Sequence, residues 1–520
     1  MLLHNSRIVS TVIDTARRRN RCVAVAFVAN SARFFLHGMP GELEANNIPG
    51  MRHDRLPNGF GVRIDPRVRT YSGGRLLVGG SPTRLLRLAP EAAALIGDGY
   101  LEVTDPTSAV VARRLLDSGV ANPRPRLLPA PEEVTVVVPH HNDDAGLRRL
   151  LSTLRGHSVV VVDDGSDRPV RIPRTGGRCR VTVLRHDVRQ GVVAARNAGL
   201  HAAATEFVAF LDSDVVPRPG WLEVMLGHFS DPEVALVAPR IVAREPDAGV
   251  LGRYESARSS LDFGRRETAV SSRGAVSYAP GAALLVRRRA LLAEGGFDEQ
   301  MRSAADIDLC WRLERAGWRL RYEPAAHVAC DSPASLGKWF ARKVSHGAAA
   351  APLADRHAGM VAPLPVPFWT LAATALLATA SRAGILGGIA TLVAALFRLR
   401  RVFAELDNPT RVAAIHLARG FSAGVWRIVS ALCRHYWPVT VLAMIASRRI
   451  RRVAVTLAVA DGLADWFTHR DSGGLDPMRY LLCKRLDDLA YGTGLWWGAV
   501  RACNVAALRP AVPRHRPGGV

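Results

Sequence analysis

Cysteine is scarce in this sequence, and the cysteines that occur form no pattern. Seven are scattered over 520 residues, with no CxxC pair and no zinc-ligand spacing. Their arrangement excludes a disulfide-stapled scaffold and a structural zinc site, and it favours a reducing compartment. A signal peptide is also lacking, because the basic cluster of residues 1–50 lies in mid-segment and the apolar run is short. We therefore expect no export, and we interpret residues 1–50 as a leader of undefined role or a start-site extension.

Acidic residues are few relative to basic ones. There are 69 Lys and Arg against 46 Asp and Glu, which leaves a net charge of +23 with His neutral and a pI near 10.9. A surplus of this size attracts nucleic acid, anionic lipid or phosphate-bearing ligands, but it does not say which. Because most of it is arginine spread over mixed-charge helices, a merely soluble and lipid-tolerant surface is an alternative explanation.

Changes in composition divide the chain into successive segments. From Leu56 to Val120, apolar and polar residues alternate around two glycine pairs, as in a hairpin, and two short helical patterns follow, the second closed by Gly119. This combination predicts a small winged-helix module. We therefore expect five segments: the leader (1–50), the winged-helix module (51–122), a proline-rich linker (123–133), a catalytic domain (134–350) and a helical C-terminal region (351–520).

The segment from Val134 onward has the pattern of an α/β domain. Short apolar runs such as VTVVV, SVVVV and FVAFL alternate with helical stretches. Strands that are apolar on both faces predict a mostly parallel, Rossmann-like sheet covered by helices on both sides. Ligands bind beyond the carboxyl ends of such strands. Acidic residues follow two of the runs: Asp163 and Asp164 after SVVVV, and Asp212 and Asp214 after FVAFL.

The stretch Asp212-Ser213-Asp214 predicts a metal site. Two carboxylates separated by one small residue supply the hard oxygen ligands that suit Mg²⁺ or Mn²⁺ shared with a diphosphate. An isolated D-x-D is more often a turn or a helix cap, so the prediction depends on its place after a buried strand. Asp306 and Asp308 stand near the start of a helix that ends at Gly317, where helix capping is the competing explanation.

The C-terminal region contains two apolar stretches. Residues 361–397 include a single charged residue, Arg382. The length of this apolar stretch is ample for one tilted or interfacial helix and marginal for a membrane-spanning hairpin. The second stretch ends in the arginine cluster of residues 448–452, a pattern typical of a surface-lying or inward-anchored segment. We expect a membrane-associated region on the cytoplasmic side; a buried, alanine-rich pair of helices is the alternative.

Several motifs together resemble glycosyltransferase family 2, over roughly Val134 to Ser332. This family comprises inverting nucleotide-sugar enzymes with the GT-A fold. Each motif alone is weak, but their combination in the family's order is specific. The matching stretches are VVVPHHND, VVVDDGS, GVVAARNAGL, FLDSD, PGAALLVRR and GGFDE followed by DIDLCWRL.

The resemblance implies a donor site. Pro139 and Asp164 would line the uracil and ribose pocket, with Asp164 accepting a hydrogen bond from the base. Arg196 would lie near the diphosphate. Asp212 would contact both ribose and the metal, Mn²⁺ or Mg²⁺, and Asp214 would bind the metal.

The resemblance also implies an acceptor side. Gly281 would leave room for acceptor and sugar, and Asp306 would be the catalytic base, which takes the proton of the attacking hydroxyl. His327 matches a position that sometimes completes the metal site, although a lone His is more often structural. The family usually carries Glu directly before the base, whereas this chain has Ala305. This departure affects the geometry expected for acceptor binding and not the assignment of the base.

The regions that flank the family 2 domain narrow the range of candidate acceptors. The module with SPTRLLRLAPEAAALI and VVARRLLDSGV looks like PqqD-like peptide-recognition domains, and the tail contains KRLDDLAYGTGLWWGAVRACNVAALRP. Fused to a family 2 domain, this architecture resembles the glycosyltransferases of actinobacterial mycofactocin systems over most of Leu56 to Pro510. The resemblance implies transfer of glucose from UDP-glucose, in successive β-1,4 steps, onto the peptide-derived mycofactocin core or its precursor peptide.

Two other functions stay open. A family 2 enzyme with a polysaccharide or lipid-linked acceptor would also account for the basic, apolar tail. A winged-helix nucleic-acid-binding protein is a different class. Against it, the helix PTSAVVARRLLDSGV has only Arg113 and Arg114 as basic residues and no aromatic or amide cluster for base edges. We therefore expect no nucleic-acid partner.

Overall fold

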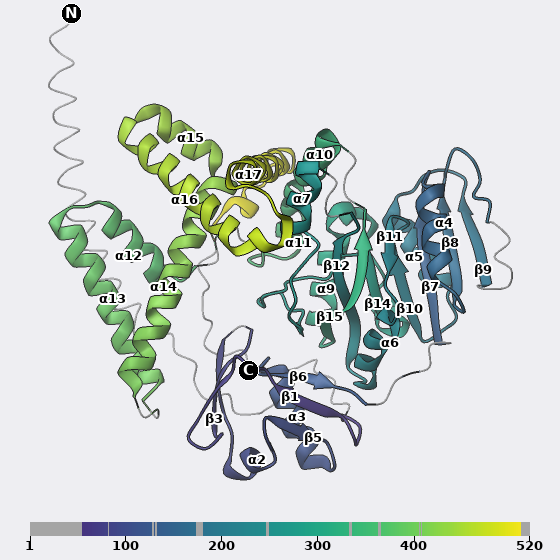
Figure 1. Cartoon of the computed structure of the whole chain (residues 1–520), viewed down its shortest axis with the longest axis horizontal. Coiled ribbons are helices and arrows are strands. Elements are labelled where there is room, and N and C mark those ends of the chain that lie inside the picture. The colour runs from purple at the N-terminus through teal and green to yellow at the C-terminus, as the bar shows by residue number, and fades with distance from the viewer. Residues whose placement is uncertain are drawn as a thin grey trace, which may run out of the picture. The chain divides into compact units, whose positions relative to one another are not determined.

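The computed structural model describes most of the chain beyond residue 54 (Figure 1). The described residues are 55–81, 83–126, 129, 133–172, 180–245, 249–331, 335–361, 364, 366–404, 406 and 408–510. The expected leader, residues 1–50, lies outside them. The chain forms two compact units: one comprises Gly50–Leu364 with Trp426–Ala511, and the other centres on Pro365–Val425.

The N-terminal module contains two small antiparallel sheets and two helices. One sheet has the order β5 (Tyr100–Glu102), β1 (Gly61–Ile64) and β6 (Ala121–Arg124). The other has the order β2 (Arg69–Tyr71), β3 (Leu76–Gly79) and β4 (Arg84–Arg87). The helices are α2 (Pro90–Ala94) and α3 (Pro106–Asp117).

The predicted local structure of this module is confirmed. Strands β2 and β3 form a hairpin through Gly73 and Gly74, whose φ angles of 65° and 88° suit glycine. Helix α3 begins at a capping box on Asp105 and ends before Gly119. Strand β6 includes residues 123 and 124, so the module extends into the segment that the sequence analysis assigned to the linker.

The catalytic domain is built on one large sheet. Its strand order is β11-β15-β12-β14-β10-β7-β8-β9, with β13 paired to β15. The strands are β7 (Val134–His140), β8 (Ser158–Asp164), β9 (Arg180–His186), β10 (Phe207–Leu211), β11 (Val215–Pro217), β12 (Val234–Ala243), β13 (Thr268–Ala269), β14 (Ala283–Arg287) and β15 (Arg319–Cys330).

The α/β class is as predicted, but the sheet is mixed rather than mostly parallel. Strands β7, β8, β9, β10, β12 and β15 run in one direction, whereas β14 runs antiparallel to both β10 and β12. The sequence could not reveal this reversal. Strand β14 is buried on both faces, like its neighbours, so its apolar run has the same appearance in either direction.

Helices cover both faces of the sheet. Helices α5 (Val192–Ala202) and α9 (Ala305–Arg315) contribute to the core on one face. Helices α4 (Asp144–Thr153) and α6 (Trp221–Leu226) contribute to the core on the other. The predicted apolar face of α4 is buried as expected, with Leu147, Leu150 and Leu151 in that second core. In sheets of this kind, ligands bind beyond the carboxyl ends of the parallel strands.

The C-terminal region is helical, as predicted. Its helices in the larger unit are α11 (Ala350–Arg356), α15 (Trp437–Ala446), α16 (Arg448–Gly473) and α17 (Pro477–Arg501), and they adjoin α7 (Gly249–Arg258) and α10 (Leu336–Ala348) of the catalytic domain. The smaller unit holds α12 (Phe368–Ala378) and α13 (Arg382–Val402), and α14 (Pro409–Arg434) passes from one unit to the other. In the described part, α13 alone is long and apolar enough to cross a membrane, and α14 with α15 passes the same criterion as a pair bent by 83°.

Candidate active site

The two carboxylates of the D-x-D stretch lie beyond the carboxyl end of β10. Asp212 accepts a hydrogen bond of 2.6 Å from Arg196 Nη2, so its charge is compensated. Asp214 has no such partner: within the described residues, the contact recorded at its carboxylate is with Cys330 Sγ at 3.8 Å. Burial, together with the charges of Asp212 and Asp331, raises the pKa of Asp214 to about 6. This site therefore holds an excess of negative charge.

Two further carboxylates surround this pair. The backbone N–H of Asp331 donates to the carbonyl oxygen of Asp214 at 3.1 Å, and the Asp331 side chain pairs with Arg149 and Arg244. Asp143 accepts a hydrogen bond of 3.1 Å from Ser213 Oγ, between the two metal-site candidates. The sequence analysis missed both residues. Asp331 directly follows strand β15, but this strand is only partly buried and contains charged residues, so the pattern that located Asp212 does not reveal it.

His327 is not part of this cluster. Strand β11 pairs Val215 with Cys330 and Pro217 with Val328, so His327 lies beyond the far end of β11. Three residues of strand separate it from Cys330, which corresponds to about 10 Å. It lines instead a cleft of about 1460 Å³, together with residues of the N-terminal module such as Tyr100 and Arg124. The structure thus separates His327 from the two aspartates with which the sequence analysis had grouped it.

Asp306 is held in the first turn of α9. Its Oδ2 accepts a hydrogen bond from the backbone N–H of Gly281 at 3.1 Å, and its Oδ1 accepts one from Ile307 at 2.9 Å. The residue is half-buried. Burial raises the pKa of its carboxyl, against the opposing effects of the Gly281 N–H and the Arg196 charge. A carboxylate fixed in this way and with a raised pKa is suited to accept a proton.

Arg196 joins the two acidic groups. It projects from α5, its side chain is 8% exposed, and its charge acts on Asp306 while its Nη2 binds Asp212. Its guanidinium lies against Gly281, where an added Cβ would be 2.7 Å from Nη1. We expected Gly281 to leave room for acceptor and sugar; in the structure, the space over this glycine holds Arg196.

The reversed strand β14 explains why Gly281 belongs to this site. The parallel strands contribute the residues at their carboxyl ends, such as Asp164 and Asp212. Strand β14 runs the other way, so its amino end lies at the same edge, and Gly281 lies two residues before it. The loop before β14 therefore brings the Gly281 N–H to Asp306.

The VDDGSD stretch is a tightly bonded turn. Asp164 accepts from His186 Nδ1 and from the backbone N–H groups of Gln190 and Gly191, at 2.8–2.9 Å. Burial disfavours its ionisation, but these hydrogen bonds lower its pKa overall. A carboxylate has about four acceptor positions, so one is left for a base or ribose. Pro139 lies next to this turn, buried in β7 and paired with Val162.

Asp308 and Asn197 have structural partners. Asp308 is fully buried and accepts hydrogen bonds from Arg312 Nε at 2.7 Å and His357 Nε2 at 2.8 Å, which ties α9 to the end of α11. The side-chain amide of Asn197 donates from Nδ2 to the carbonyl oxygen of Phe297 and accepts at Oδ1 from the backbone N–H of Phe297. The structure thus gives Asp308 a packing role and leaves Asp306 as the acid of α9 that faces the site.

Comparison with known proteins agrees with this geometry. Residues 135–293 match the model of the family described as "Glycosyl transferase family 2". The "Pre-mycofactocin glycosyltransferase" of Mycobacterium tuberculosis is 50% identical over 471 residues, which are 89% of this chain and 100% of the relative. The "N-acetylglucosaminyl-diphospho-decaprenol L-rhamnosyltransferase" of the same organism is 31% identical over 246 residues, 40% of this chain and 78% of that protein.

These similarities define the class: the chain is a glycosyltransferase of family 2. Within that class, it belongs to the pre-mycofactocin glycosyltransferases. A solved mannosyltransferase from Pyrobaculum calidifontis covers 69% of this chain and 89% of its own, with 18% identity and a TM-score of 0.33. That likeness is too low to support an argument of its own.

Proposed function

We propose that this enzyme is a metal-dependent, inverting hexosyltransferase that adds glucose from UDP-glucose to the mycofactocin core, in successive β-1,4 steps. The relative's name supports the acceptor. The observation that carries the mechanism is the convergence around Arg196, which contacts Asp212 on one side and stabilises the charge of Asp306 on the other. A donor diphosphate bound near Asp212 and an acceptor hydroxyl bound near Asp306 would therefore both lie close to the Arg196 guanidinium.

The acidic cluster fits a divalent cation. Asp214 is a half-buried carboxylate near other negative charges, and such a group is costly unless a cation compensates it. Among the described residues, no three His, Cys, Asp or Glu side chains are grouped so that they could hold an ion alone. Mg²⁺ and Mn²⁺ commonly take one or two carboxylates and complete their shell with substrate phosphates and water. Asp212 and Asp214 would supply the protein ligands, and the ion would neutralise the leaving diphosphate.

Asp306 would act as the general base. It would take the proton of the acceptor hydroxyl while that oxygen forms a bond to the anomeric carbon. The bond from that carbon to the diphosphate oxygen would break, and UDP would leave with the electron pair. Because attack and departure occur on opposite faces, an α-linked donor would give a β-linked product. Asp164, with its one remaining acceptor position, would orient the uracil or ribose.

The N-terminal module would contribute to acceptor recognition. We retain peptide recognition of the PqqD-like type as its proposed role, because mycofactocin derives from a peptide. A role in nucleic-acid binding is not supported by its contacts: Arg113 of α3 pairs with Asp231 at 2.6 Å and with Glu233 at 3.2 Å, both in the catalytic domain. This arginine is thus engaged within the protein.

The test is mass spectrometry of the mycofactocin core after incubation with the purified full-length chain, Mn²⁺ or Mg²⁺ and UDP-glucose. We expect stepwise addition of hexosyl residues, absent with Asp306→Asn and absent after chelation of the metal. If the chain hydrolyses UDP-glucose but does not modify the core, the proposed donor stands and the proposed acceptor is wrong. The exposed apolar helices would then favour a lipid-linked acceptor, tested next with polyprenyl diphosphate sugars.

A further inference from the structure

Helix α17 exposes an apolar face. Its outward residues recur every three or four positions, which places them on one side of the helix. Trp497 is 61% exposed, Val500 67% and Met478 66%. The apolar residues of this outer face are Met478, Leu482, Leu486, Leu489, Trp497 and Val500.

The inner face of α17 carries charges. Lys484, Asp487 and Asp488 are each no more than 3% exposed. Lys484 Nζ pairs with Asp461 of α16 at 2.9 Å and with Asp488 at 3.3 Å. Asp487 pairs with Arg434 of α14 at 3.2 Å. Acids and bases thus satisfy one another in the interior of the helical region.

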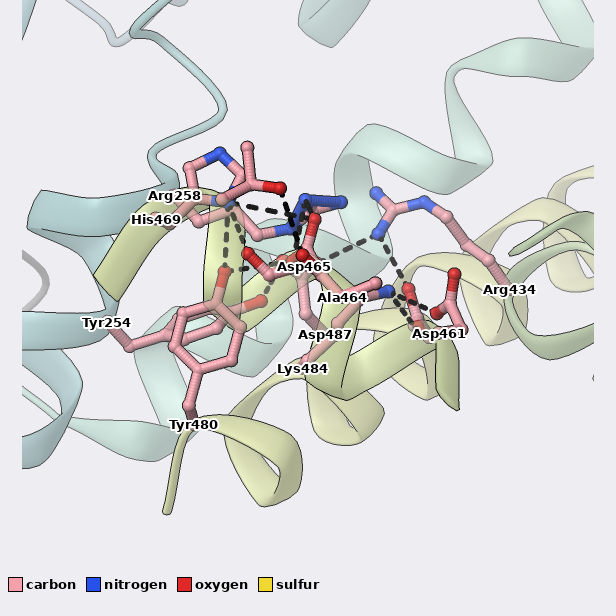
Figure 2. A network of polar contacts seen from close by, with 12 residues as sticks. Tyr254, Arg258, Arg434, Asp461, Ala464, Asp465, His469, Tyr480, Lys484 and Asp487 are labelled. Carbon is pink, nitrogen blue, oxygen red and sulfur yellow. Dashed lines mark hydrogen bonds and ion pairs between the residues drawn. The ribbon is translucent and has the colours of Figure 1, made fainter. Parts of the chain in front are cut away.

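Figure 2 shows how these charges converge from several helices. Tyr254 of α7 donates to Asp487 at 3.2 Å, and Arg258 pairs with Asp465 at 3.1 Å. Tyr480 also donates to Asp465, at 2.8 Å. The network therefore joins the C-terminal helices to α7, which belongs to the catalytic domain.

This arrangement is the reverse of that in a water-exposed helix. Helices that face water bury an apolar stripe and expose polar residues. Helices that face lipid expose apolar residues, and their ionisable groups lie toward the bundle interior and pair there. Charged residues, buried or exposed, lower the mean hydropathy of a helix, and neither α16 nor α17 meets the criterion for a membrane span.

The two helices before α17 also expose apolar residues, and α16 contacts both α15 and α17. Helix α15 has no buried residue, and its Leu442 and Ile445 are 66% and 74% exposed. Helix α16 follows it directly and exposes Val453 and Phe467. A connected set of three helices that is apolar on the outside exceeds the scattered apolar residues usual on a soluble surface.

An arginine cluster borders this surface. Arg448, Arg449, Arg451 and Arg452 are exposed in the first turns of α16, and they form no ion pair with any described residue. Positive charge at a helix N-terminus opposes the helix dipole, so this position is unfavourable without an anionic partner. Arginines beside an apolar surface match the anionic headgroups of a cytoplasmic leaflet.

We propose that the outer faces of α15, α16 and α17 lie on an anionic lipid bilayer at the inner face of the cell membrane, with Arg448–Arg452 at the headgroups. The inner charge network would connect this lipid-bound layer to the catalytic domain. The proposal does not depend on the identity of the donor or acceptor.

The test uses the purified full-length chain and vesicles that contain a phospholipid with a photoactivatable acyl chain. After irradiation, mass spectrometry identifies the labelled residues. We expect labels on the outer face of α17 and on α15, and none on the buried face that carries Lys484. Labels restricted to residues 366–404 would overturn the proposal, because α13 alone would then hold the chain to lipid.

Flotation with phosphatidylglycerol and phosphatidylcholine vesicles tests the arginine cluster. Changing Arg448, Arg449, Arg451 and Arg452 together to Gln should weaken binding to phosphatidylglycerol by about tenfold or more and leave binding to phosphatidylcholine unchanged. Equal binding of the original chain to both vesicles would contradict the proposed anionic preference.

A paired substitution separates lipid from a second protein copy. Leu482→Asp with Trp497→Asp should remove the labels on α17, whereas Val110→Asp, a control in α3 at a residue 68% exposed, should not. If the apolar face instead binds another copy, sedimentation will show an oligomer that the paired substitution dissociates, without lipid labelling, and the lipid proposal fails.

Discussion

Replacing Asp214 by Asn should stabilise the metal-free protein at neutral pH. The pKa of this carboxyl is raised from 3.8 to about 6 in the folded state. The folded state therefore binds more protons than the unfolded state between these pH values, and stability falls as the pH rises through this window. Above pH 6 the ionised carboxylate costs up to about 3 kcal/mol, at about 1.4 kcal/mol for each pH unit. Below pH 4 the carboxyl is protonated in both states and the cost disappears.

The assay is thermal unfolding of the chelator-treated protein at pH 5 and pH 8. Asp214→Asn should melt several degrees above the original chain at pH 8, and the difference should shrink at pH 5. Added Mn²⁺ should raise the melting point of the original chain, because a ligand that binds the folded state stabilises it, and should have little effect on the variant.

A matched variant controls for the loss of any acidic group. Asp212 is already compensated by Arg196 at 2.6 Å, so Asp212→Asn should lower the melting point at pH 8 in the absence of metal. The reasoning is refuted if Asp214→Asn melts at or below the temperature of the original chain at pH 8, or if both variants shift in the same direction.

Further predictions concern the base, its glycine neighbour and the charge network. Asp306→Asn should reduce transfer at least a hundredfold, while the affinity for UDP-glucose, measured by calorimetry, should stay within about threefold. Because burial raises the pKa of the Asp306 carboxyl, the activity of the original enzyme should begin to fall at a higher pH than it would with an ordinary carboxylate as the base. Gly281→Ala should lower kcat and the melting point by displacing the Arg196 guanidinium, whereas Gly337→Ala, at a glycine with open space around it and no positive φ, should leave kcat unchanged. Lys484→Met should destabilise the folded chain by about 1–3 kcal/mol, because Asp461 and Asp488 would keep Arg485 but lose one buried partner. Equal midpoints in urea would contradict this.

The sequence was sufficient where a local pattern determines the structure. The strand ends at Asp164 and Asp212 were placed correctly, because apolar, β-branched runs have few alternatives to a buried strand. The glycine-containing hairpin and the end of α3 followed from turn chemistry. The acid at Asp306 was also found, although its pairing with the Gly281 N–H depends on a loop that no local pattern describes.

The failures concern relations between distant segments. His327 was grouped with Asp214 because it matches a family position that sometimes completes the metal site, but the register of β11 on β15 places Cys330 and Asp331 next to Asp214. The direction of β14 could not be predicted, because this strand is buried on both faces and its apolar run has the same appearance in either direction. The charges of α17 had no interpretation, because their partners Asp461 and Arg434 are on other helices.

The reversed strand has a consequence for how such enzymes diversify. In the proposed site, the aspartates that would bind the metal are anchored at strand ends that continue from the sheet core, where an insertion would disturb register. The side that would face the acceptor depends on the loop before β14, whose length can vary while β14 keeps its pairing with β10 and β12. Acceptor preference can therefore change in evolution through one loop, without altering the chemistry that activates the sugar donor.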